Sequence, residues 1–220
     1  MKLATFIDHT LLRADSTLSD IQKLCEEATQ FGFATVCVPP YYVGRSSQLL
    51  EKKTTRVATV IGFPMGYTTT VAKVEEIKRA IDEGVDELDV VVNVSAIKSG
   101  EWIDVQNDLD RMITTAHLRR KLIKVILETG LLTPAEIKRA CEICQELKPD
   151  FVKTSTGFNG EGATIGMVKL LRENLSKEIK IKASGGIRTL EDALRLIEAG
   201  AVRLGTSSSV RIMKDFAAKQ

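Results

Sequence analysis

Short runs rich in valine and isoleucine alternate with helical segments along the whole chain. In the segment 70–83, for example, apolar residues recur at spacings of three and four, which is typical of an amphipathic helix. Continuous apolar runs followed by helices are typical of parallel strands that are buried on both faces. Eight runs can be read as such strands: 4–8, 34–38, 57–61, 87–92, 122–127, 150–153, 179–183 and 201–204. Eight strand–helix units in 220 residues predict a (β/α)8 TIM barrel at the small end of its size range.

Capping signals mark the ends of the helical segments. Thr133, followed by Pro134 and Glu136, predicts a capping box with proline at the first helical position, and Thr189 with Asp192 opens a later helix. Three glycines stand between a helical pattern and a strand, where they fit a left-handed cap: Gly32, Gly84 and Gly200. The expected helices lie near 18–31, 40–52, 70–83, within 95–119, from 133, near 163–175, from 189 and from 208 onward.

An open, doubly wound sheet would also alternate strands and helices. It usually needs fewer strands, and no GxGxxG motif follows the first strand of this chain. The barrel is therefore favoured, as one catalytic domain over residues 1–220.

Charge and composition exclude several classes of function. The chain has 31 basic and 29 acidic residues with no basic block, so nucleic acid is not an expected partner. The amino terminus lacks the apolar core of a secretory signal, and the longest apolar stretches are too short to cross a bilayer. We expect a cytoplasmic protein without a membrane partner, with reduced cysteines. Cys141 and Cys144 form a CxxC, but they lie on the apolar face of a helical pattern, which favours core packing over a metal site.

Two lysines stand at the ends of consecutive strand-like runs. Lys153 lies in DFVKTSTGF and Lys182 in IKIKASGGIR. Burial disfavours the charged form of a lysine, and two ammonium groups about 6 Å apart repel by about 3 kcal/mol at an effective dielectric near 20. Such a lysine is a nucleophile for carbonyl carbons through a Schiff base. Lysines whose heads extend into water are the alternative, but the pair with the glycines after it favours a functional site.

Other polar residues stand at strand ends, where the active sites of barrels lie. Asp89 interrupts the valine-rich run ELDVVVNV, and a carboxylate there needs a partner. Facing the lysines, it could transfer protons or fix Lys182. Asp8 would pair with a lysine, and Thr10 could bind a substrate hydroxyl or simply cap a turn. His9 has the opposite parity and is expected to face the helix layer.

Two turns rich in glycine and serine suggest a phosphate site. They follow the last two strands, at 184–188 and 205–209, where barrels often bind phosphate with backbone N–H groups and the start of a helix. Arg188 could add positive charge or pair with Glu191 on the surface. Cys37, at the end of the second strand, is interpreted as buried filler of the core.

These residues together resemble a known family, the 2-deoxyribose-5-phosphate aldolases, which are class I aldolases on a (β/α)8 barrel. The resemblance extends from IDHTLL to GTSS and includes VCVPP, VIGFPMG, ELDVVVN, KVILETG, FVKTSTGF and KASGGIR in order. It implies reversible cleavage of 2-deoxy-D-ribose 5-phosphate to D-glyceraldehyde 3-phosphate and acetaldehyde, without a metal or organic cofactor.

The resemblance also implies a role for each matching residue. Lys153 would form the Schiff base, Lys182 would lower its pKa, and Asp89 would transfer protons. Asp8 would belong to the network around Lys182. The expected substrate-binding residues are Asp8, Thr10 and Thr156, and the expected phosphate contacts are Gly157, Gly185, Gly186, Ser207 and Ser208.

Two departures from the family pattern bear on rate and binding. Some members have a lysine directly after KTSTG, where this chain has Phe158, so that phosphate contact is missing or replaced. Some members end in a tyrosine that reaches the active site, and the segment RIMKDFAAKQ contains none. Proton exchange would then depend more on Asp89 and water.

Three alternatives share parts of this pattern. Another Schiff-base barrel enzyme, such as a ketose-phosphate aldolase, would share one lysine, but the second lysine argues against it. A sugar-phosphate isomerase or epimerase commonly needs a glutamate or metal-binding histidines, and this chain has 2 histidines. A sugar-phosphate-binding regulator would have no reason to keep both lysines and Asp89. A homo-oligomer, dimer or tetramer, is compatible with the sequence but not indicated by it.

Overall fold

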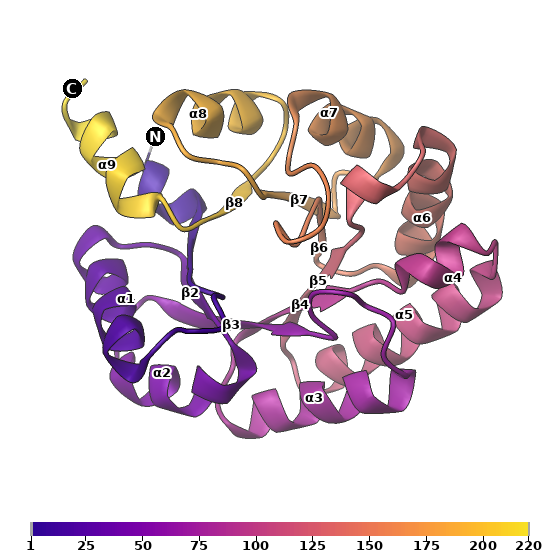
Figure 1. Cartoon of the computed structure of the whole chain (residues 1–220), viewed down its shortest axis with the longest axis horizontal. Coiled ribbons are helices and arrows are strands. Elements are labelled where there is room, and N and C mark those ends of the chain that lie inside the picture. Colours follow the sequence, from indigo (N-terminus) through magenta and orange to yellow (C-terminus); the bar gives the residue numbers. More distant parts are fainter. Residues whose placement is uncertain (1, 220) are drawn as a thin grey trace.

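The strands close into one parallel barrel in chain order, as predicted. The computed structural model describes residues 2–219. Each strand pairs with its sequence neighbours, and the last pairs with the first (Figure 1). The strands are β1 (Ile7–Thr10), β2 (Thr35–Val38), β3 (Arg56–Ile61), β4 (Glu87–Val91), β5 (Leu122–Ile126), β6 (Phe151–Lys153), β7 (Lys180–Ser184) and β8 (Arg203–Thr206).

Helices surround the barrel as an outer ring (Figure 1). They are α1 (Leu18–Phe31), α2 (Val43–Leu49), α3 (Thr70–Asp82), α4 (Val94–Lys98), α5 (Trp102–Leu118), α6 (Pro134–Leu147), α7 (Ile165–Asn174), α8 (Leu190–Glu198) and α9 (Ser209–Ala217). Three 3-10 turns add to them: η1 (Leu3–Phe6), η2 (Pro40–Tyr42) and η3 (Thr129–Leu131). The predicted capping boxes at Thr133 and Thr189 are present, and Gly32, Gly84 and Gly200 have positive φ angles, as expected.

Three sequence-based boundaries were wrong. The first strand was expected at 4–8, but residues 3–6 form η1, whose backbone bonds are local, including Thr5 N to Lys2 O. The last strand was expected at 201–204 and begins at Arg203, because Ala201 still donates to Leu196 O as part of the helix end before it. The expected helix at 40–52 is shorter, η2 followed by α2.

The fourth helical segment was placed within 95–119 and contains two helices, α4 and α5. Gly100, with a φ of 74°, separates them. Such a left-handed angle suits glycine and ends a helix, so the break lies where the sequence permits it.

The interior of the barrel is divided between an apolar part and a charged part. Cys37, Ala58 and Val60, from β2 and β3, form a small apolar cluster of their own. The large core lies between strands and helices and includes Cys141 and Cys144, as the prediction of core packing required. Charged side chains occupy the rest of the barrel interior, so this division determines where chemistry is possible.

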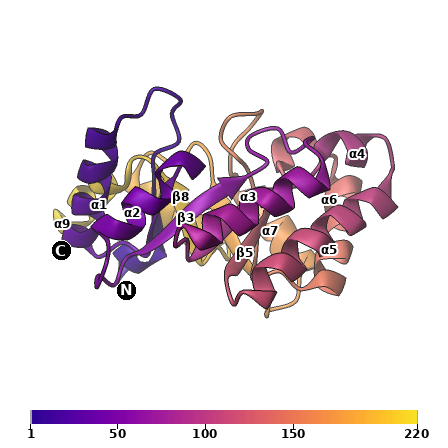
Figure 2. The same cartoon turned by 90° about the horizontal axis from the view of Figure 1, so that it is seen from below.

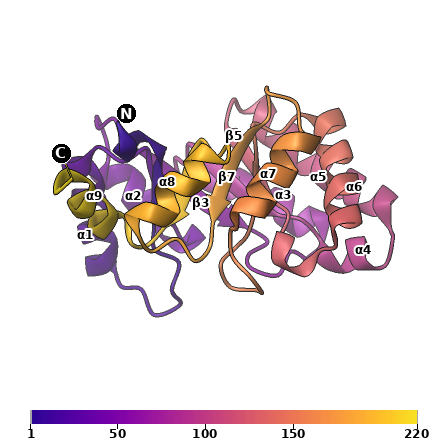
Figure 3. The same ribbon diagram turned by 90° about the horizontal axis from the view of Figure 1, so that it is seen from above.

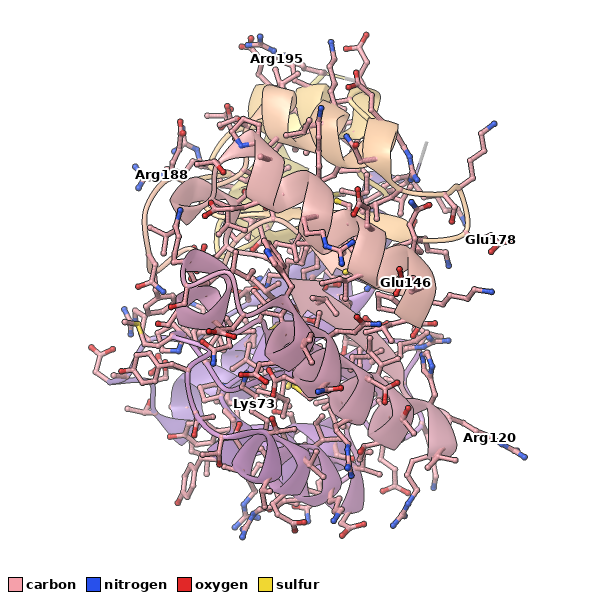
Figure 4. The ribbon with its side chains drawn as sticks, turned by 90° about the vertical axis from the view of Figure 1, so that its right-hand side faces the viewer. Lys73, Arg120, Glu146, Glu178, Arg188 and Arg195 are labelled. Atoms are coloured by element: carbon pink, nitrogen blue, oxygen red, sulfur yellow. The ribbon has the colours of Figure 1, made fainter. Side chains whose placement is uncertain are left out.

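The loops after β1 and β6 project from the same end of the barrel. Figures 2 and 3 show both loops, indigo and orange, on one side of the helix ring. Figure 4 shows Arg188, after β7, and Arg120, before β5, at opposite ends of the molecule. The carboxyl ends of the strands therefore meet at the end that carries Arg188. Within residues 2–219, every helix is too short or too polar to span a bilayer.

Candidate active site

Lys153 and Lys182 are direct partners across the β6–β7 pairing. Lys153 Nζ donates to Asp89 Oδ2 at 2.8 Å, and Lys182 Nζ donates to the same oxygen at 2.7 Å. Lys153 is 2% exposed, while Lys182 and Asp89 are fully buried. The structure therefore brings the three residues predicted as catalytic into one contact, with both lysines directed into the barrel.

A wider ion network surrounds this contact. Lys182 also donates to Asp8 Oδ2, as predicted for Asp8. Lys124, on β5, donates to Asp89 Oδ1 at 2.7 Å and lies 2.8 Å from Glu87 Oε2. Arg203, on β8, completes the network, since it donates to Asp8 Oδ1 at 2.6 Å and to Glu87 Oε2 at 3.0 Å.

The network has one positive group too many for neutrality. Its buried part contains four basic side chains and three carboxylates, all of them at most 13% exposed. Arg56, which lies 3.9 Å from Glu87 Oε1, is exposed and is not part of this count. Net buried charge is costly, so one basic group is expected to release its proton. Lys124, Lys182 and Arg203 each contact two carboxylates. Lys153 contacts one oxygen and shares it with Lys182. The balance therefore favours Lys153 as the neutral amine.

The pKa shifts agree with this assignment. Burial lowers the pKa of Lys153, the charge of Asp89 opposes that effect, and the charge of Lys182 adds to it. Burial also acts against the charged form of Lys182, but Asp8 and Asp89 outweigh it and raise the pKa of Lys182. The predicted influence of Lys182 on Lys153 has the right direction. It is smaller than the effect of burial and smaller than the opposing effect of the Asp89 carboxylate, which the sequence alone did not place beside Lys153.

Asp89 is held as a carboxylate. Burial opposes its ionisation, but Lys124, Lys153 and Lys182 outweigh burial and keep the pKa of Asp89 well below its ordinary value. Burial acts in the same way on Asp8, and Lys182 and Arg203 keep the pKa of Asp8 below its ordinary value. An ionised Asp89 can accept a proton first and return it afterwards, so the resting site holds a base beside the amine.

A glycine makes room for Lys182. Gly205, on β8, is so close that a Cβ there would lie 3.1 Å from Lys182 Cε and 3.0 Å from Ser184 Cβ. Any larger residue would displace one of them. The sequence analysis treated Gly205 as part of a turn, but it belongs to the strand and fixes the space around the ammonium group.

A polar pocket of about 460 Å3 opens at the carboxyl end of the strands. Arg13 and Arg188 line it from the loops after β1 and β7. Its lining includes seven of the eight residues that the sequence predicted for substrate and phosphate: Thr10, Thr156, Gly157, Gly185, Gly186, Ser207 and Ser208. The eighth, Asp8, does not line the pocket, because its carboxylate is engaged by Lys182 and Arg203. Lys153 ends β6, before the loop that carries Thr156 and Gly157. Lys153 therefore lies deeper in the barrel than the pocket.

The glycines of the pocket adopt conformations that suit few other residues. Gly157, Gly185 and Gly186 have φ angles of 84°, 92° and 77°.

Ser208 stands at the start of α9, and its N–H donates to Thr206 Oγ1 at 2.9 Å. The Ser208 hydroxyl makes no cap bond to α9, so it is the group that Ser208 can offer to an anion at this helix start.

A second, apolar pocket of about 580 Å3 adjoins the first and shares Leu12 with it. Phe63, Pro64 and Met65 are among the residues that line it, and Glu76 is its one charged lining residue. It is the larger of the two, but the smaller one carries the glycine turns and the arginines. The smaller pocket therefore suits a phosphorylated ligand.

Comparisons with known proteins agree with this geometry. A model of the DeoC/LacD family of aldolases matches residues 2–213. The chain belongs to the DeoC/LacD aldolase family. It is 49% identical to a deoxyribose-phosphate aldolase of Thermococcus gammatolerans, over 97% of this chain and 96% of that protein. A deoxyribose-phosphate aldolase of Carboxydothermus hydrogenoformans is 47% identical, with coverage of 97% and 94%.

Solved structures of similar sequence share this fold. A putative deoxyribose-phosphate aldolase from Coccidioides immitis superposes with a TM-score of 0.94 at 44% identity, covering 98% of this chain and 86% of that one. A tetrameric deoxyribose phosphate aldolase from Aeropyrum pernix has a TM-score of 0.92 at 32% identity, with coverage of 99% and 92%. Family membership makes this chain an enzyme, a carbon–carbon lyase of the class I aldolase type.

Sequence reasoning missed four charged residues of the aldolase site. Lys124, Glu87 and Arg203 stand inside strand-like runs, where only their charge could have drawn attention. Lys124 is also a lysine within a buried run, like Lys153, but three more apolar residues follow it before the first polar one, so it does not stand at the end of its run. Glu128, just after β5, contacts Thr156 and carried no recognisable signal.

The two remaining expectations for the aldolase were correct. His9 faces the helix layer, where its ring contacts Glu27 at 2.9 Å and Ser209 at 3.1 Å. Cys37 is fully buried in the small apolar cluster, and burial raises the pKa of its thiol to about 11. Neither residue therefore offers a catalytic group in this arrangement.

Proposed function

We propose that this aldolase cleaves 2-deoxy-D-ribose 5-phosphate reversibly to D-glyceraldehyde 3-phosphate and acetaldehyde, through a Schiff base on Lys153. The observation that carries the proposal is the charge balance around Lys153. Lys153 is the basic group of the network with a single, shared carboxylate oxygen, and it lies below a pocket with phosphate-binding character. The names of the curated relatives support the choice of substrate.

Imine formation begins with the neutral amine. Lys153 Nζ attacks the C1 aldehyde carbon to give a carbinolamine. The carbinolamine hydroxyl takes up a proton from the Lys182 ammonium group or from solvent and leaves as water, so that a protonated imine remains. Burial, together with the neighbouring charge of Lys182, lowers the pKa of Lys153 and so favours its neutral form. Asp89, shared by both lysines, can take up the proton that the attacking amine releases.

Carbon–carbon cleavage uses the imine as an electron sink. The C3 hydroxyl loses its proton, its C–O bond becomes a carbonyl, and the C2–C3 bond breaks. The electron pair of that bond becomes the double bond of an enamine on Lys153, and D-glyceraldehyde 3-phosphate departs. Asp89 is ionised and contacts both lysines, so it is placed to accept this proton, directly or through water, although its low pKa makes it a weak base.

Release of acetaldehyde reverses the first steps. The enamine takes a proton at C2 and becomes an imine, and water then hydrolyses it to free acetaldehyde and Lys153. The phosphate, held remotely by the glycine turns and the arginines of the pocket, supplies binding energy that orients the reacting carbons.

Borohydride trapping tests this proposal. The enzyme is incubated with acetaldehyde and borohydride, digested, and mapped by mass spectrometry, with and without Lys153→Leu. An ethyl adduct on the Lys153 peptide that the variant lacks is the expected result. An adduct on Lys182 would exchange the roles of the lysines, and the absence of any adduct would contradict Schiff-base chemistry.

Two further expectations stay predictions. We propose a phosphorylated sugar as the small-molecule partner, and a homo-oligomer, dimer or tetramer, as the solution state. Sedimentation velocity of the full chain measures the second, and a monomer at micromolar concentration would contradict it.

A further inference from the structure

Glu128 is a buried acidic residue in a strained backbone conformation at the rim of the site. It follows β5 directly, is fully buried, and has φ and ψ angles of 56° and 55°. Residues other than glycine rarely adopt this left-handed conformation, and where they do the strain often accompanies function. The mechanism described above gives Glu128 no role.

The Glu128 carboxylate is occupied by donors from the loop after β6. Thr156 N donates to its Oε1 at 3.1 Å, and the Thr156 hydroxyl donates to its Oε2. Asn159 Nδ2 also approaches Oε2, at 3.4 Å, and donates to Pro64 O at 3.2 Å. Burial raises the pKa of Glu128, while the bonds from Thr156 oppose that shift. A carboxylate that meets three donors has the hydrogen-bond pattern of an ionised group.

These contacts fix the polarity of the Thr156 hydroxyl. Its proton is directed at Glu128, and its oxygen accepts the Phe158 N–H at 3.1 Å. A hydroxyl has one proton and two lone pairs, so one lone pair remains. Thr156 is 6% exposed and lines the polar pocket. Toward the pocket, the Thr156 hydroxyl can therefore still accept a hydrogen bond but cannot donate one.

We propose that Glu128 is a positioning residue that holds Thr156 as a hydrogen-bond acceptor and thereby selects acceptor aldehydes with a hydroxyl next to the carbonyl. The proposal rests on the function proposed above and on the place of Thr156 in the lining of the pocket that would hold the substrate. The negative charge behind Thr156 pulls on its proton and makes its oxygen a stronger acceptor. A substrate hydroxyl can donate to it, whereas a methylene in the same place leaves this oxygen without a partner.

A purely structural role makes a different prediction. Glu128 would then only hold the loop, and its loss would weaken all substrates alike. The test compares two acceptors in acetaldehyde addition: D-glyceraldehyde 3-phosphate, and 3-phosphooxypropanal, which lacks the hydroxyl. The measured quantity is the ratio of their kcat/KM values, because a general loss of activity cancels in it.

The decisive variants are Glu128→Gln, Thr156→Val and the double variant. A glutamine keeps the size of Glu128 but removes its charge, and its NH2 group can face the Thr156 hydroxyl and turn that proton toward the pocket. We expect each single variant to lower the preference for the hydroxylated acceptor about tenfold. We expect the double variant to lower it no further, since both changes remove the same contact.

Two controls separate positioning from loop stability. Asn159→Ala removes the bond to Pro64 and the long contact to Glu128 but leaves both bonds between Thr156 and Glu128, so it should preserve the preference even if total activity falls. Thr156→Ser retains the hydroxyl and should preserve it too. An unchanged preference in Glu128→Gln, or equal losses in Asn159→Ala and Glu128→Gln, would overturn the proposal.

Folding and the proposed function are checked separately. If Glu128→Gln does not fold, a preference in Thr156→Val equal to that of the unmodified enzyme still overturns the proposal. Borohydride trapping of acetaldehyde needs no acceptor, so the adduct on Lys153 should persist in Glu128→Gln. Its absence from the unmodified enzyme would instead refute the proposed function.

Discussion

Lys153 and Lys182 donate to one and the same oxygen, Asp89 Oδ2, from paired positions on adjacent strands. The two lysines are nevertheless unequal, because Lys182 has a second carboxylate partner, Asp8, and Lys153 has only Asp89. One carboxylate oxygen between two ammonium groups cannot fully stabilise both. The arrangement therefore assigns the charge to Lys182 and the free amine to Lys153.

Removal of either lysine should stop catalysis for different reasons. Lys153→Leu removes the nucleophile, and we expect no measurable turnover. Lys182→Leu leaves the nucleophile but removes the charge that keeps it neutral, and we expect a loss of at least about a hundredfold in kcat. Lys180→Leu is the matched control, since Lys180 is an exposed lysine on the same strand as Lys182. Full activity of the Lys182 variant near neutral pH would refute this division of roles.

The pH dependence of imine formation should reveal the tuning of Lys153. Free amine increases as pH rises, so the rate should rise through the pKa of Lys153, which burial and Lys182 hold below 10.5. Lys182→Met removes one of the lowering effects and leaves Asp89 Oδ2 to Lys153, while Lys124 keeps its bond to Oδ1. We expect the midpoint of the rate profile to move to higher pH. Single-turnover trapping at a series of pH values measures it, and an unchanged midpoint would show that Lys182 does not tune the amine.

The buried carboxylates should make stability fall in acid. The ordinary pKa of an aspartate is 3.8, and the folded protein holds the pKa values of Asp8 and Asp89 below it. A lowered folded pKa contributes stability that is fully present above the unfolded pKa and is lost as pH falls through the folded value. We expect the free energy of unfolding to decline steeply below about pH 4. Urea unfolding at several pH values measures the slope, which should be shallower in Asp8→Asn.

Gly205 should tolerate no side chain without a cost in rate. A methyl group in Gly205→Ala would lie 3.1 Å from Lys182 Cε and would push the ammonium group away from Asp8 and Asp89. We expect kcat to fall about tenfold with little change in KM, because misplacement of a catalytic group acts on the chemical step. Gly32→Ala offers a control, since nothing lies within 4 Å of a Cβ there and only the backbone is strained. Unchanged kcat in Gly205→Ala would mean that Lys182 has more freedom than its packing indicates.

The sequence predicted most of this fold because its signals are local. Valine-rich runs and capping boxes identify strands and helices without any knowledge of distant contacts. The first strand was misplaced because ATFID has strand-like composition, while its backbone bonds are satisfied within η1. Composition could not distinguish these two outcomes.

The site was predictable where a polar residue ended or interrupted an apolar run in a recognisable way. Lys153 and Lys182 stood near the ends of their runs, Asp89 interrupted a valine-rich run, and barrel closure brought the three together. Lys124 stands within its run, and it reaches Asp89 because the two residues are paired across β4 and β5. The pairing of two strands cannot be read from the alternation of residues along each strand. The position of Glu128 depends on a backbone turn with positive φ, for which a glutamate gives no sequence signal.

Phe158 stands at a position where some family members have a lysine, so the effect of a positive charge there can be tested. Phe158 lines the polar pocket, is 56% exposed, and packs edge-on against Phe63 with ring centroids 5.1 Å apart. Phe158→Lys should bring an ammonium group to the phosphate and lower KM for the phosphorylated substrate about tenfold, with kcat little changed. The same variant should gain nothing with 2-deoxyribose, which lacks the phosphate. Steady-state kinetics with both sugars provide the comparison. An equal gain with both sugars would mean that loss of the Phe63 contact, rather than phosphate binding, had opened the pocket.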